Sequence, residues 1–462
     1  MTYPEAIQYL ESFINYEKIL NWSYKESLKL ERIREFLTTI NNPQDSLKCI
    51  HIAGTKGKGS TCAFIAYMLK EAGYKVGLYT SPHLSDFRER IRILYPQKLN
   101  AKDDRHPISF APGTRTASHQ VQDCFEGMIP KSELTKLVER LKPVIERYNR
   151  DSKYGPLSFF EVYTALGFVY FKEKNVDFVV LETGLGGRLD ATNVVEPIVC
   201  AITPISYEHT QQLGSTLSEI AAEKAGIIKG HQLIVISAPQ EKEAQEVIRQ
   251  KCREVGAKLY EVSKDIFCEK MRQGFNVLGI FGEYPNIETR LLGSHQLINA
   301  AVAVGLIEAL RFHDIIIDSN SVREGLYNTL WPGRCEVISR GPLVVLDGAQ
   351  NIASARVLKE TIKENFQYKR LILVLGISKD KDIKGVCNEL NDLPDEIILT
   401  QANNPRAREP QSLASFFNKR KIHLTSNIKE AKEKIKVLAE KDDLVLVTGS
   451  LFVVGEFRNG GL

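Results

Sequence analysis

The sequence has no long apolar run and little net charge, and each absence excludes a class of protein. No stretch of about eighteen apolar residues occurs among the 462 residues, so we expect no membrane-spanning segment. The first residues, MTYPEAIQYLESF, include acidic side chains and lack a basic-then-apolar signal pattern. The formal net charge of only +4 gives no indication that nucleic acid is a partner.

Cysteine pairs and zinc-type spacings are also missing. The eight cysteines are scattered, without a CxxC pair. Several lie in apolar segments, where a free thiol behaves as a small hydrophobic side chain. We therefore expect reduced thiols in a cytoplasmic protein.

The composition and length are those of an ordinary globular protein with two or three domains, since 43% of the residues are hydrophobic and 26% are charged. Near-continuous apolar runs alternate with segments that have helical periodicity, and such runs are typical of strands covered on both faces. The alternation predicts parallel α/β units. The expected strands are 49–54, 76–81, 176–182, 198–205 and 233–238, followed by 343–349, 371–377, 396–401 and 444–450.

A Trp-Pro-Gly in the segment LYNTLWPGRCEVI (326–338) separates the two sets of strands. It predicts a large N-terminal α/β domain over residues 1–330 and a smaller C-terminal α/β domain over 334–462. Two such domains form a cleft, which suits a two-substrate site. Residues 95–125 are polar with little periodicity, so we interpret them as a surface insertion.

The strongest local motif is the glycine-rich stretch 54–60, GTKGKGS, between an expected strand and an expected helix. Glycines let backbone N–H groups approach phosphate oxygens, and a helix N-terminus adds positive potential. The match to the standard phosphate loop is incomplete, because Ile52 and Gly59 stand where glycine and Ser/Thr are expected. The alternative is a simple glycine-rich turn. We predict a phosphate-binding loop in which Lys58 reaches the terminal phosphates.

Polar residues follow the next two expected strands. Glu182 ends VDFVVLE, where a carboxylate faces the crevice at the carboxyl edge of a sheet and can hold the magnesium that ATP requires. The glycines within 183–193 permit a tight backbone near a ligand, although turns use glycine too. Glu208-His209 follows IVCAITPI, and Lys224 lies in AEKAGI. Taken alone, His209 would be interpreted as structural and Lys224 as a solvated charge.

Together, these motifs resemble the folylpolyglutamate synthase branch of the Mur ligase family almost from end to end. The resemblance rests on LERIREFLTTINNPQ, GTKGKGS, YTSPHLSDFRERIRI, SFFEVYTAL, LETGLGGRLDATNVV, EKAGIIK, WPGRCEVI, DGAQN, GISKDKD, NPRA and VTGSLFVVGE. It implies Mur ligase architecture: a P-loop-type parallel-sheet ATPase domain followed by a smaller Rossmann-like glutamate ligase domain. The insertion at 95–125 has no counterpart in the family pattern.

The family's functional residues carry over by position. Those implied to bind ATP are Gly54, Thr55, Gly57, Lys58, Gly59, Ser60, Asn299, Arg334 and Asp347. The implied magnesium ligands are Ser81, Glu182 and His209. Lys224 matches a lysine that is carbamylated, and with Lys58 and His209 it makes up the implied catalytic set. The implied folate pocket is lined by His83, Ser158, Phe159, Phe160, Glu161, Leu189, Asp190 and Ala191.

The adjacent Phe159 and Phe160 cannot both face the same way on a helix or strand, so one could stack on the pterin or aminobenzoyl ring while the other packs in the core. The alternative is that both belong to the core.

Four positions depart from the family pattern. Lys56 stands for asparagine, Glu208 for aspartate, Lys29 for glycine and Gln350 for histidine.

The resemblance implies a monomeric enzyme that uses ATP and Mg²⁺ to ligate L-glutamate to reduced folates through an acyl phosphate. SPHL and LSFFE further suggest that dihydropteroate is accepted, which would make the enzyme bifunctional. One alternative is a Mur-type ligase of cell-wall precursors, which would not share LGGRLDATN and SPHL. Another is a non-catalytic nucleotide-binding regulator, against which the intact Lys58, Glu182, His209 and Lys224 argue.

Overall fold

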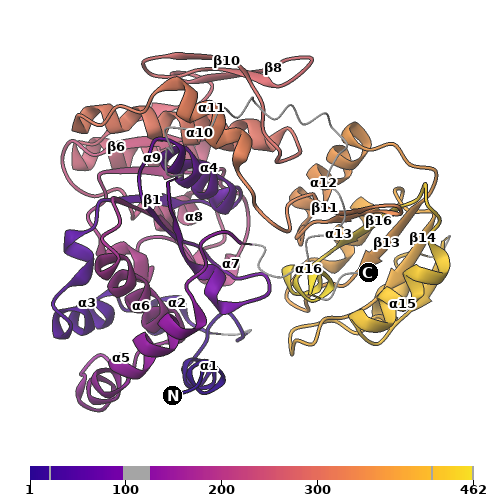
Figure 1. Ribbon diagram of the computed structural model, residues 1–462, viewed down its shortest axis with the longest axis horizontal. Coiled ribbons are helices and arrows are strands. Elements are labelled where there is room, and N and C mark those ends of the chain that lie inside the picture. The colour runs from indigo at the N-terminus through magenta and orange to yellow at the C-terminus, as the bar shows by residue number, and fades with distance from the viewer. Residues whose placement is uncertain (20–21, 97–124, 418–419, 460–462) are drawn as a thin grey trace, which may run out of the picture.

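The computed structural model describes residues 1–19, 22–96, 125–417 and 420–459, and these residues form three sheets. Figure 1 shows a larger unit built from the N-terminal two thirds of the chain beside a smaller unit built from the rest. Most of the insertion predicted at 95–125 lies outside the described residues.

A seven-stranded sheet with the order β3-β2-β4-β1-β5-β6-β7 forms the centre of the larger unit. All neighbours pair in parallel except β3, which is antiparallel to β2. The strands are β1 Cys49–Ala53, β2 Val76–Tyr79, β3 Ile91–Leu94, β4 Phe178–Glu182, β5 Val199–Ile202, β6 Ile234–Ser237 and β7 Lys258–Glu261. The carboxyl ends of β1, β4 and β5 therefore meet at one edge, which positions the candidate site.

Helices cover both faces of this sheet, which explains why its strands are apolar without alternation. One face packs against α4 Lys58–Glu71, α10 His295–Ala309 and α11 Ser319–Asn328. The other packs against α3 Leu30–Thr39, α5 Lys131–Asp151, α6 Phe159–Glu173, α8 Leu217–Ala225 and α9 Lys242–Val255. Shorter elements complete the unit: α1 Tyr3–Glu11, α2 Tyr24–Ser27, α7 Thr210–Leu213, and the 3-10 helices η1 Pro43–Ser46, η2 Phe87–Arg90, η3 Ala191–Val194 and η4 Leu310–His313.

Two further sheets follow along the chain. A small antiparallel sheet contains β8 Phe267–Lys270, β9 Phe275–Leu278 and β10 Glu283–Ile287. The smaller unit holds a six-stranded sheet with the order β11-β12-β16-β13-β14-β15. Its strands are β11 Glu336–Arg340, β12 Leu343–Leu346, β13 Leu371–Leu375, β14 Glu396–Leu399, β15 Lys421–Leu424 and β16 Leu444–Thr448. Helices α12 Ile352–Asn365, α13 Ile383–Leu390 and α14 Gln411–Ala414 cover one face, and α15 Ile428–Leu438 and α16 Leu451–Arg458 cover the other.

The prediction of parallel α/β units is confirmed, since each expected apolar run contains one of these strands. The predicted strands begin or end up to a few residues outside the observed ones. The strands that were not expected are β3, β7, β11, β15 and those of the small β8–β10 sheet.

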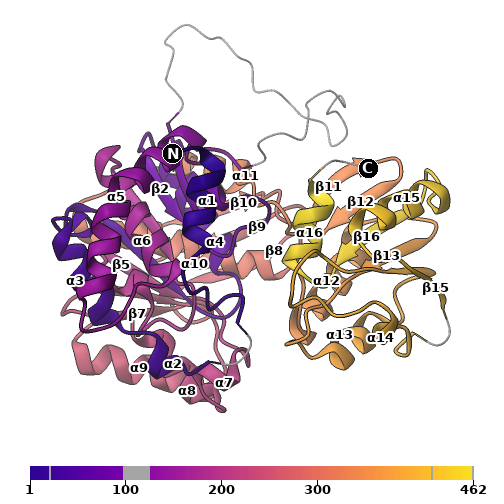
Figure 2. The ribbon, with the colours of Figure 1, turned by 90° about the horizontal axis from the view of Figure 1, so that it is seen from below.

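The two units contact each other at several places. In both Figure 1 and Figure 2, α16 lies on the side of the smaller unit that faces the larger one. Ser85 Oγ of the larger unit donates to the Gly455 carbonyl of α16 at 3.4 Å, and Lys270 Nζ pairs with Glu364 at 2.9 Å. The segment that joins the units packs its Trp331 ring so tightly on Gly59 that a Cβ there would lie 2.8 Å from the ring.

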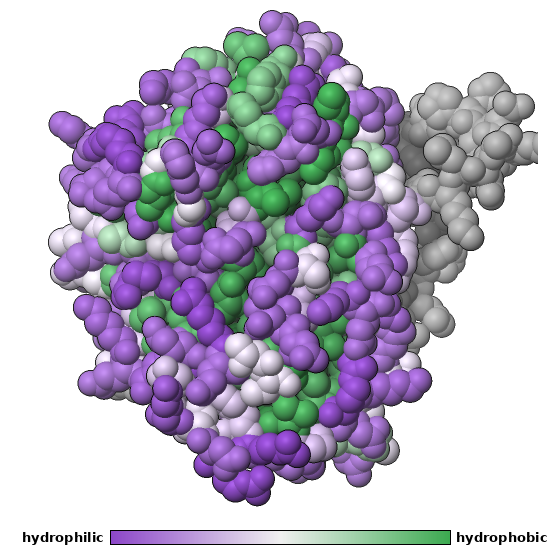
Figure 3. Space-filling model, turned by 90° about the vertical axis from the view of Figure 1, so that its left-hand side faces the viewer, coloured by the Kyte–Doolittle hydropathy of each residue, from purple (hydrophilic) through white to green (hydrophobic). Residues whose placement is uncertain are grey.

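The surface of the larger unit that faces away from the smaller one is predominantly hydrophilic, with apolar patches between the polar side chains (Figure 3). None of the helices in the described ranges is long and apolar enough to cross a membrane. The cysteines in those ranges are free thiols, whereas Cys124 lies outside them.

Candidate active site

The glycine-rich loop 54–60 joins β1 to α4, as its sequence predicts. Gly54 and Gly57 adopt φ values of +149° and +82°, which side chains rarely tolerate. Space is restricted as well, because a Cβ on Gly54 would lie 1.8 Å from Thr203 Oγ1, and one on Gly57 would lie 2.1 Å from Asn299 Oδ1. Gly57 is the N-cap of the fourteen-residue α4, so the first N–H groups of this helix point out of its end. This arrangement can hold phosphate oxygens.

Lys58 and Glu182 face each other beside this loop. Lys58 Nζ lies 4.0 Å from Glu182 Oε1, and the Ser81 backbone N–H donates to Glu182 Oε2 at 3.1 Å. Lys58 comes after β1 and Glu182 ends β4. The two side chains meet because these strands are neighbours in the sheet. Glu182 is only 5% exposed, and burial raises its pKa while the Lys58 ammonium opposes that shift. The carboxylate thus sits in a confined, polar position next to the phosphate loop.

Lys224 approaches the same loop from α8. Its Nζ donates to the Gly54 carbonyl oxygen at 2.7 Å, and the residue is only 4% exposed. Burial, together with the nearby Lys58 ammonium, lowers the pKa of Lys224 to about 7. Lys224 is therefore a buried amine beside the phosphate loop, in contrast to the solvated charge that its sequence alone would suggest.

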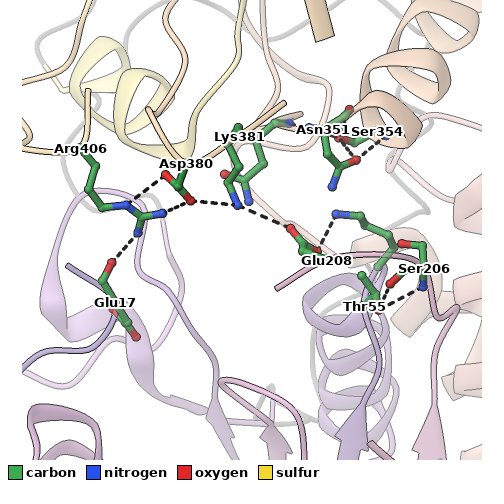
Figure 4. Close-up of polar contacts among 11 residues, drawn as sticks. Glu17, Thr55, Ser206, Glu208, Asn351, Ser354, Asp380, Lys381 and Arg406 are labelled. Atoms are coloured by element: carbon green, nitrogen blue, oxygen red, sulfur yellow. Dashed lines mark hydrogen bonds and ion pairs between the residues drawn. The ribbon is translucent and has the colours of Figure 1, made fainter. Parts of the chain in front are cut away.

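A chain of ion pairs runs from the phosphate loop into the smaller unit (Figure 4). Lys56 Nζ pairs with Glu208 at 2.9 Å, and Glu208 also pairs with Lys381 Nζ at 3.8 Å. Burial alone would raise the pKa of Glu208, but the two ammonium groups hold it well below its usual range. Asp380 accepts from Arg406 and lies 3.6 Å from Lys381 Nζ.

Arg406 extends this chain back to the larger unit by donating to the Glu17 carbonyl oxygen. The sequence motifs GISKDKD and NPRA contain Lys381, Asp380 and Arg406, but no role was assigned to them from sequence. The sequence shows these three residues only as charged side chains in two loops that follow predicted strands. Pairing partners that lie so far apart in the chain could not be identified from that pattern.

The remaining predicted nucleotide residues surround the same region. Asn299 of α10 lies against Gly57 and donates from Nδ2 to Gln296 Oε1 at 2.9 Å. Asp347 follows β12 and accepts from the backbone N–H groups of Cys335 and Ala349, each at 2.9 Å. Burial raises the pKa of Asp347. Arg334 Nη1 donates to the Gly333 carbonyl at 3.0 Å, close to Gly348.

A cleft of about 500 Å³ opens next to the phosphate loop and is lined by both units. The larger unit contributes Asn15, Tyr16, Glu17, Ile19, Trp22, Leu28, Lys29, Ile33, Ser81, Pro82, Ser158, Phe160, Glu161, Gly184, Leu185, Leu189, Asp190, Ala191, His209, Thr210, Gln211 and Gln212. The smaller unit contributes Gln350, Ser378, Lys379, Asp380, Lys381, Arg406, Leu451 and Phe452. The cleft therefore brings together residues predicted for the metal, Ser81 and His209, and residues predicted for the folate, whereas the nine predicted ATP-binding residues lie outside its lining.

Two predicted pocket residues are not in this lining. Phe159 is fully buried and packs on Tyr163, with ring centroids 5.5 Å apart, whereas its neighbour Phe160 faces the cleft. His83 accepts from Arg90 Nε through its Nδ1 at 2.9 Å, and its ring packs at a tilt against Phe87 with centroids 4.4 Å apart. Glu161 does line the cleft, but its carboxylate is already paired with Arg32 at 2.8 Å.

Sequence reasoning missed the N-terminal segment that forms one wall of the cleft. The rings of Tyr16 and Trp22 pack at a tilt there with centroids 4.6 Å apart, and Ile19 and Lys29 also belong to the lining. This segment has little hydrophobic periodicity, so the only available signal was its unusual density of aromatic residues.

No group of three or more His, Cys, Asp or Glu side chains in the described part of the chain is arranged to hold a metal ion. The predicted set instead combines a hydroxyl, a carboxylate and an imidazole from Ser81, Glu182 and His209, all of which line or adjoin the cleft. Glu182 Oε1 faces Lys58 Nζ at 4.0 Å and accepts no hydrogen bond from the described residues, so it is available as an oxygen ligand. Oxygen-rich sets suit Mg²⁺.

A phosphate loop, a buried carboxylate and a buried lysine opposite a second α/β unit are the features of a Mur-type ATP-dependent amide ligase. In agreement, the Mur ligase middle domain matches residues 160–307, and the Mur ligase glutamate ligase domain matches residues 333–451. The dihydrofolate synthase/folylpolyglutamate synthase of Bacillus subtilis (strain 168) is 35% identical over 439 residues, which cover 93% of this chain and 94% of that protein.

Solved structures of the same kind share the whole fold. The Mycobacterium tuberculosis folylpolyglutamate synthase complexed with ADP aligns with a TM-score of 0.83 and 27% identity, over 99% of this chain and 97% of that one. The E. coli FolC in complex with DHPP and ADP aligns with a TM-score of 0.81 and 26% identity, over 99% and 96%. The chain belongs to the dihydrofolate synthase/folylpolyglutamate synthase family, which confirms the predicted family, architecture and enzyme class, including the use of ATP.

Proposed function

We propose that this enzyme ligates L-glutamate to the carboxylate of reduced folates, and also to dihydropteroate, with ATP as the energy source. The observation that carries the proposal is the juxtaposition of the phosphate loop, Lys58 and Glu182 with a two-unit cleft of about 500 Å³. A cleft of that volume suits a small organic substrate. The family relationship supports the same reaction.

The chain's own groups account for the binding of ATP. The N–H groups at the start of α4 and the Lys58 ammonium hold the phosphates, while Asn299, Arg334 and Asp347 complete the nucleotide site. Ser81, Glu182 and His209 would hold Mg²⁺, which neutralises charge on the phosphates when it is bound. Lys224, carrying a carbamate, would present a further carboxylate at the phosphate loop.

The reaction has two chemical steps. The substrate carboxylate takes the terminal phosphoryl group of ATP and becomes an acyl phosphate, with ADP as the leaving group. The amine of glutamate then attacks the acyl carbon, and phosphate leaves from the tetrahedral intermediate. Lys58 stabilises charge that develops on the transferred group, and the walls of the two units keep water from the acyl phosphate.

The cleft also supports the proposed bifunctionality. Phe160, Tyr16 and Trp22 offer aromatic surfaces for a pterin or aminobenzoyl ring, and Lys379, Lys381 and Arg406 offer positive charge on the opposite wall. Dihydropteroate and tetrahydrofolate share these rings and differ in where the reacting carboxylate lies. A shift of the ligand along the cleft would bring either carboxylate to the phosphate loop.

We further propose a monomeric, cytoplasmic enzyme whose domains span residues 1–330 and 334–462. The free thiols of the described residues support the location. The close contact of Trp331 with Gly59 supports a boundary in this joining segment, because the chain passes there from one sheet to the next.

The test uses purified enzyme with ATP, Mg²⁺ and L-glutamate, and either dihydropteroate or tetrahydrofolate. Released phosphate and the glutamylated product are measured together. Turnover of both substrates is expected. Turnover of tetrahydrofolate alone would contradict the bifunctional proposal, and turnover of dihydropteroate alone would leave a dihydrofolate synthase only. Phosphate release only with cell-wall precursors would identify another Mur-type ligase, and no turnover at all would identify a non-catalytic homologue.

A further inference from the structure

A polar side chain is buried in the middle of the central strand without a role in the proposed reaction. His51 of β1 is fully buried, and its neighbours along the strand are apolar. It extends to the face of the sheet opposite α4, where its Nε2 lies 2.8 Å from Thr192 Oγ1. Its other ring nitrogen, Nδ1, has no hydrogen-bond partner among the described residues.

Thr192 connects this histidine to a residue of the cleft. Its hydroxyl donates to Asp190 Oδ1 at 2.5 Å, and its backbone N–H donates to the same oxygen at 3.0 Å. The second oxygen, Oδ2, accepts from the backbone N–H groups of Gly184 and Leu185, each at 2.9 Å. Asp190, Gly184 and Leu185 all line the cleft. One buried carboxylate therefore shapes the loop that follows Glu182.

The direction of each proton in this chain follows from the contacts. The Asp190 carboxylate accepts at both oxygens, so the single hydroxyl proton of Thr192 is given to Asp190. The Thr192 oxygen can then only accept from His51, which requires a proton on Nε2 and a lone pair on Nδ1. Burial lowers the pKa of His51 to about 3, in agreement with a neutral ring. A proton on Nδ1 instead would leave a buried N–H group without an acceptor.

We propose that His51 is a positioning residue for the pterin side of the cleft, acting through Thr192 on Asp190 and on the loop 184–189. This inference rests on the proposed function, because it concerns the pocket for the pteridine-bearing substrate. This chain of hydrogen bonds from His51 through Thr192 to Asp190, here called the relay, keeps the Asp190 carboxylate as an acceptor of fixed orientation. It also joins the strand that leads into the phosphate loop to the loop that forms the adjacent wall of the cleft.

The test removes each link of the relay at nearly constant volume. Thr192→Val and His51→Leu remove the hydroxyl and the imidazole, whereas Thr192→Ser and His51→Gln retain a hydroxyl and an N–H donor at equivalent positions. The matched control is Ile52→Val, a buried change in the same strand without a polar link. Each variant is checked by thermal unfolding, and KM and kcat are measured for the pteridine substrate, ATP and glutamate.

The two disabling variants should raise KM for the pteridine substrate about tenfold, as expected for one lost buried hydrogen bond. KM for ATP and for glutamate should stay near wild-type values, and the Ser and Gln variants should restore most of the loss. If His51→Leu does not fold, the comparison of Thr192→Val with Thr192→Ser still tests the relay. The control variant Ile52→Val should change none of the three KM values.

Three results would overturn parts of the reasoning. An unchanged KM for the pteridine substrate in Thr192→Val would refute the relay while leaving the proposed function intact. A parallel rise in KM for ATP would show a general structural role of β1, since this strand leads directly into the phosphate loop. A wild-type enzyme that turns over neither pteridine substrate would refute the proposed function, and the inference with it.

Discussion

Lys224 provides a quantitative test of the site, because its amine is buried and yet able to lose its proton near neutral pH. A primary amine reacts with carbon dioxide only when it is neutral. With a pKa of about 7 in place of the usual 10.5, about 90% of the Lys224 amine is neutral at pH 8, compared with roughly 0.3% for an ordinary lysine. The reactive fraction is thus about 300-fold larger at this position.

The expected result is a carbamate on Lys224 that depends on bicarbonate and on pH. Because the folded-state pKa is lowered, the reactive amine is present above pH 7 and is lost as the pH falls through 7. Enzyme dialysed free of carbon dioxide should lose activity and regain it with bicarbonate, and the concentration required should rise below pH 7. Native mass spectrometry should show the added mass of one carbon dioxide.

Substitution separates the carbamate from the bare amine. Lys224→Ala should lower kcat by about 100-fold, as is typical when a group that supports a metal site is removed. A short carboxylic acid added to the buffer should restore part of the rate. Lys229→Met serves as the control, since Lys229 also donates to backbone carbonyls, those of Asn193 and Val195. Fully active enzyme with an unmodified Lys224 and no response to bicarbonate would refute the reasoning.

Four further substitutions test the nucleotide and metal assignments. Lys58→Ala should lower the rate of ligation by about 10²–10³-fold without changing the thermal unfolding temperature, and normal turnover by the folded variant would contradict the phosphate-loop assignment. Glu182→Gln and His209→Ala should each raise the Mg²⁺ concentration for half-maximal rate about tenfold, and an unchanged magnesium titration of both would show that the metal lies elsewhere. Gln350→His should change KM for ATP modestly and add a pH dependence near neutrality, whereas a large loss of activity would mean that the site depends on glutamine.

The parts of the fold that the sequence predicted well are those with strong local physical causes. The nine strands were recognisable because burial on both faces requires near-continuous apolar runs. The phosphate loop was recognisable because its geometry excludes side chains, as the contacts at Gly54 and Gly57 show. Adjacent residues on a helix point about 100° apart. This is why Phe160 reaches the cleft while Phe159, at the start of α6, packs in the core.

The parts that escaped prediction depend on contacts between distant segments. The aromatic wall formed by Tyr16 and Trp22 belongs to a segment with little regular structure, so no periodicity marks it. The pairing of Glu208 with Lys381 joins the two units, and charged residues in loops are usually solvated. His83 was expected in the pocket because of its motif, but Arg90 draws it toward the core.

The Lys56–Glu208 pair has a consequence for how substitutions at these two positions combine. The resembling family pattern has asparagine and aspartate at these positions, so both differences fall on one ion pair beside the phosphate loop. Without Lys56 the Glu208 carboxylate would lack its nearest cation, whereas Lys56 could still pair with a shorter aspartate. We therefore expect the two positions to be energetically coupled. Reverting Lys56 alone should cost more activity than reverting Glu208 alone, and reverting both should restore much of that loss.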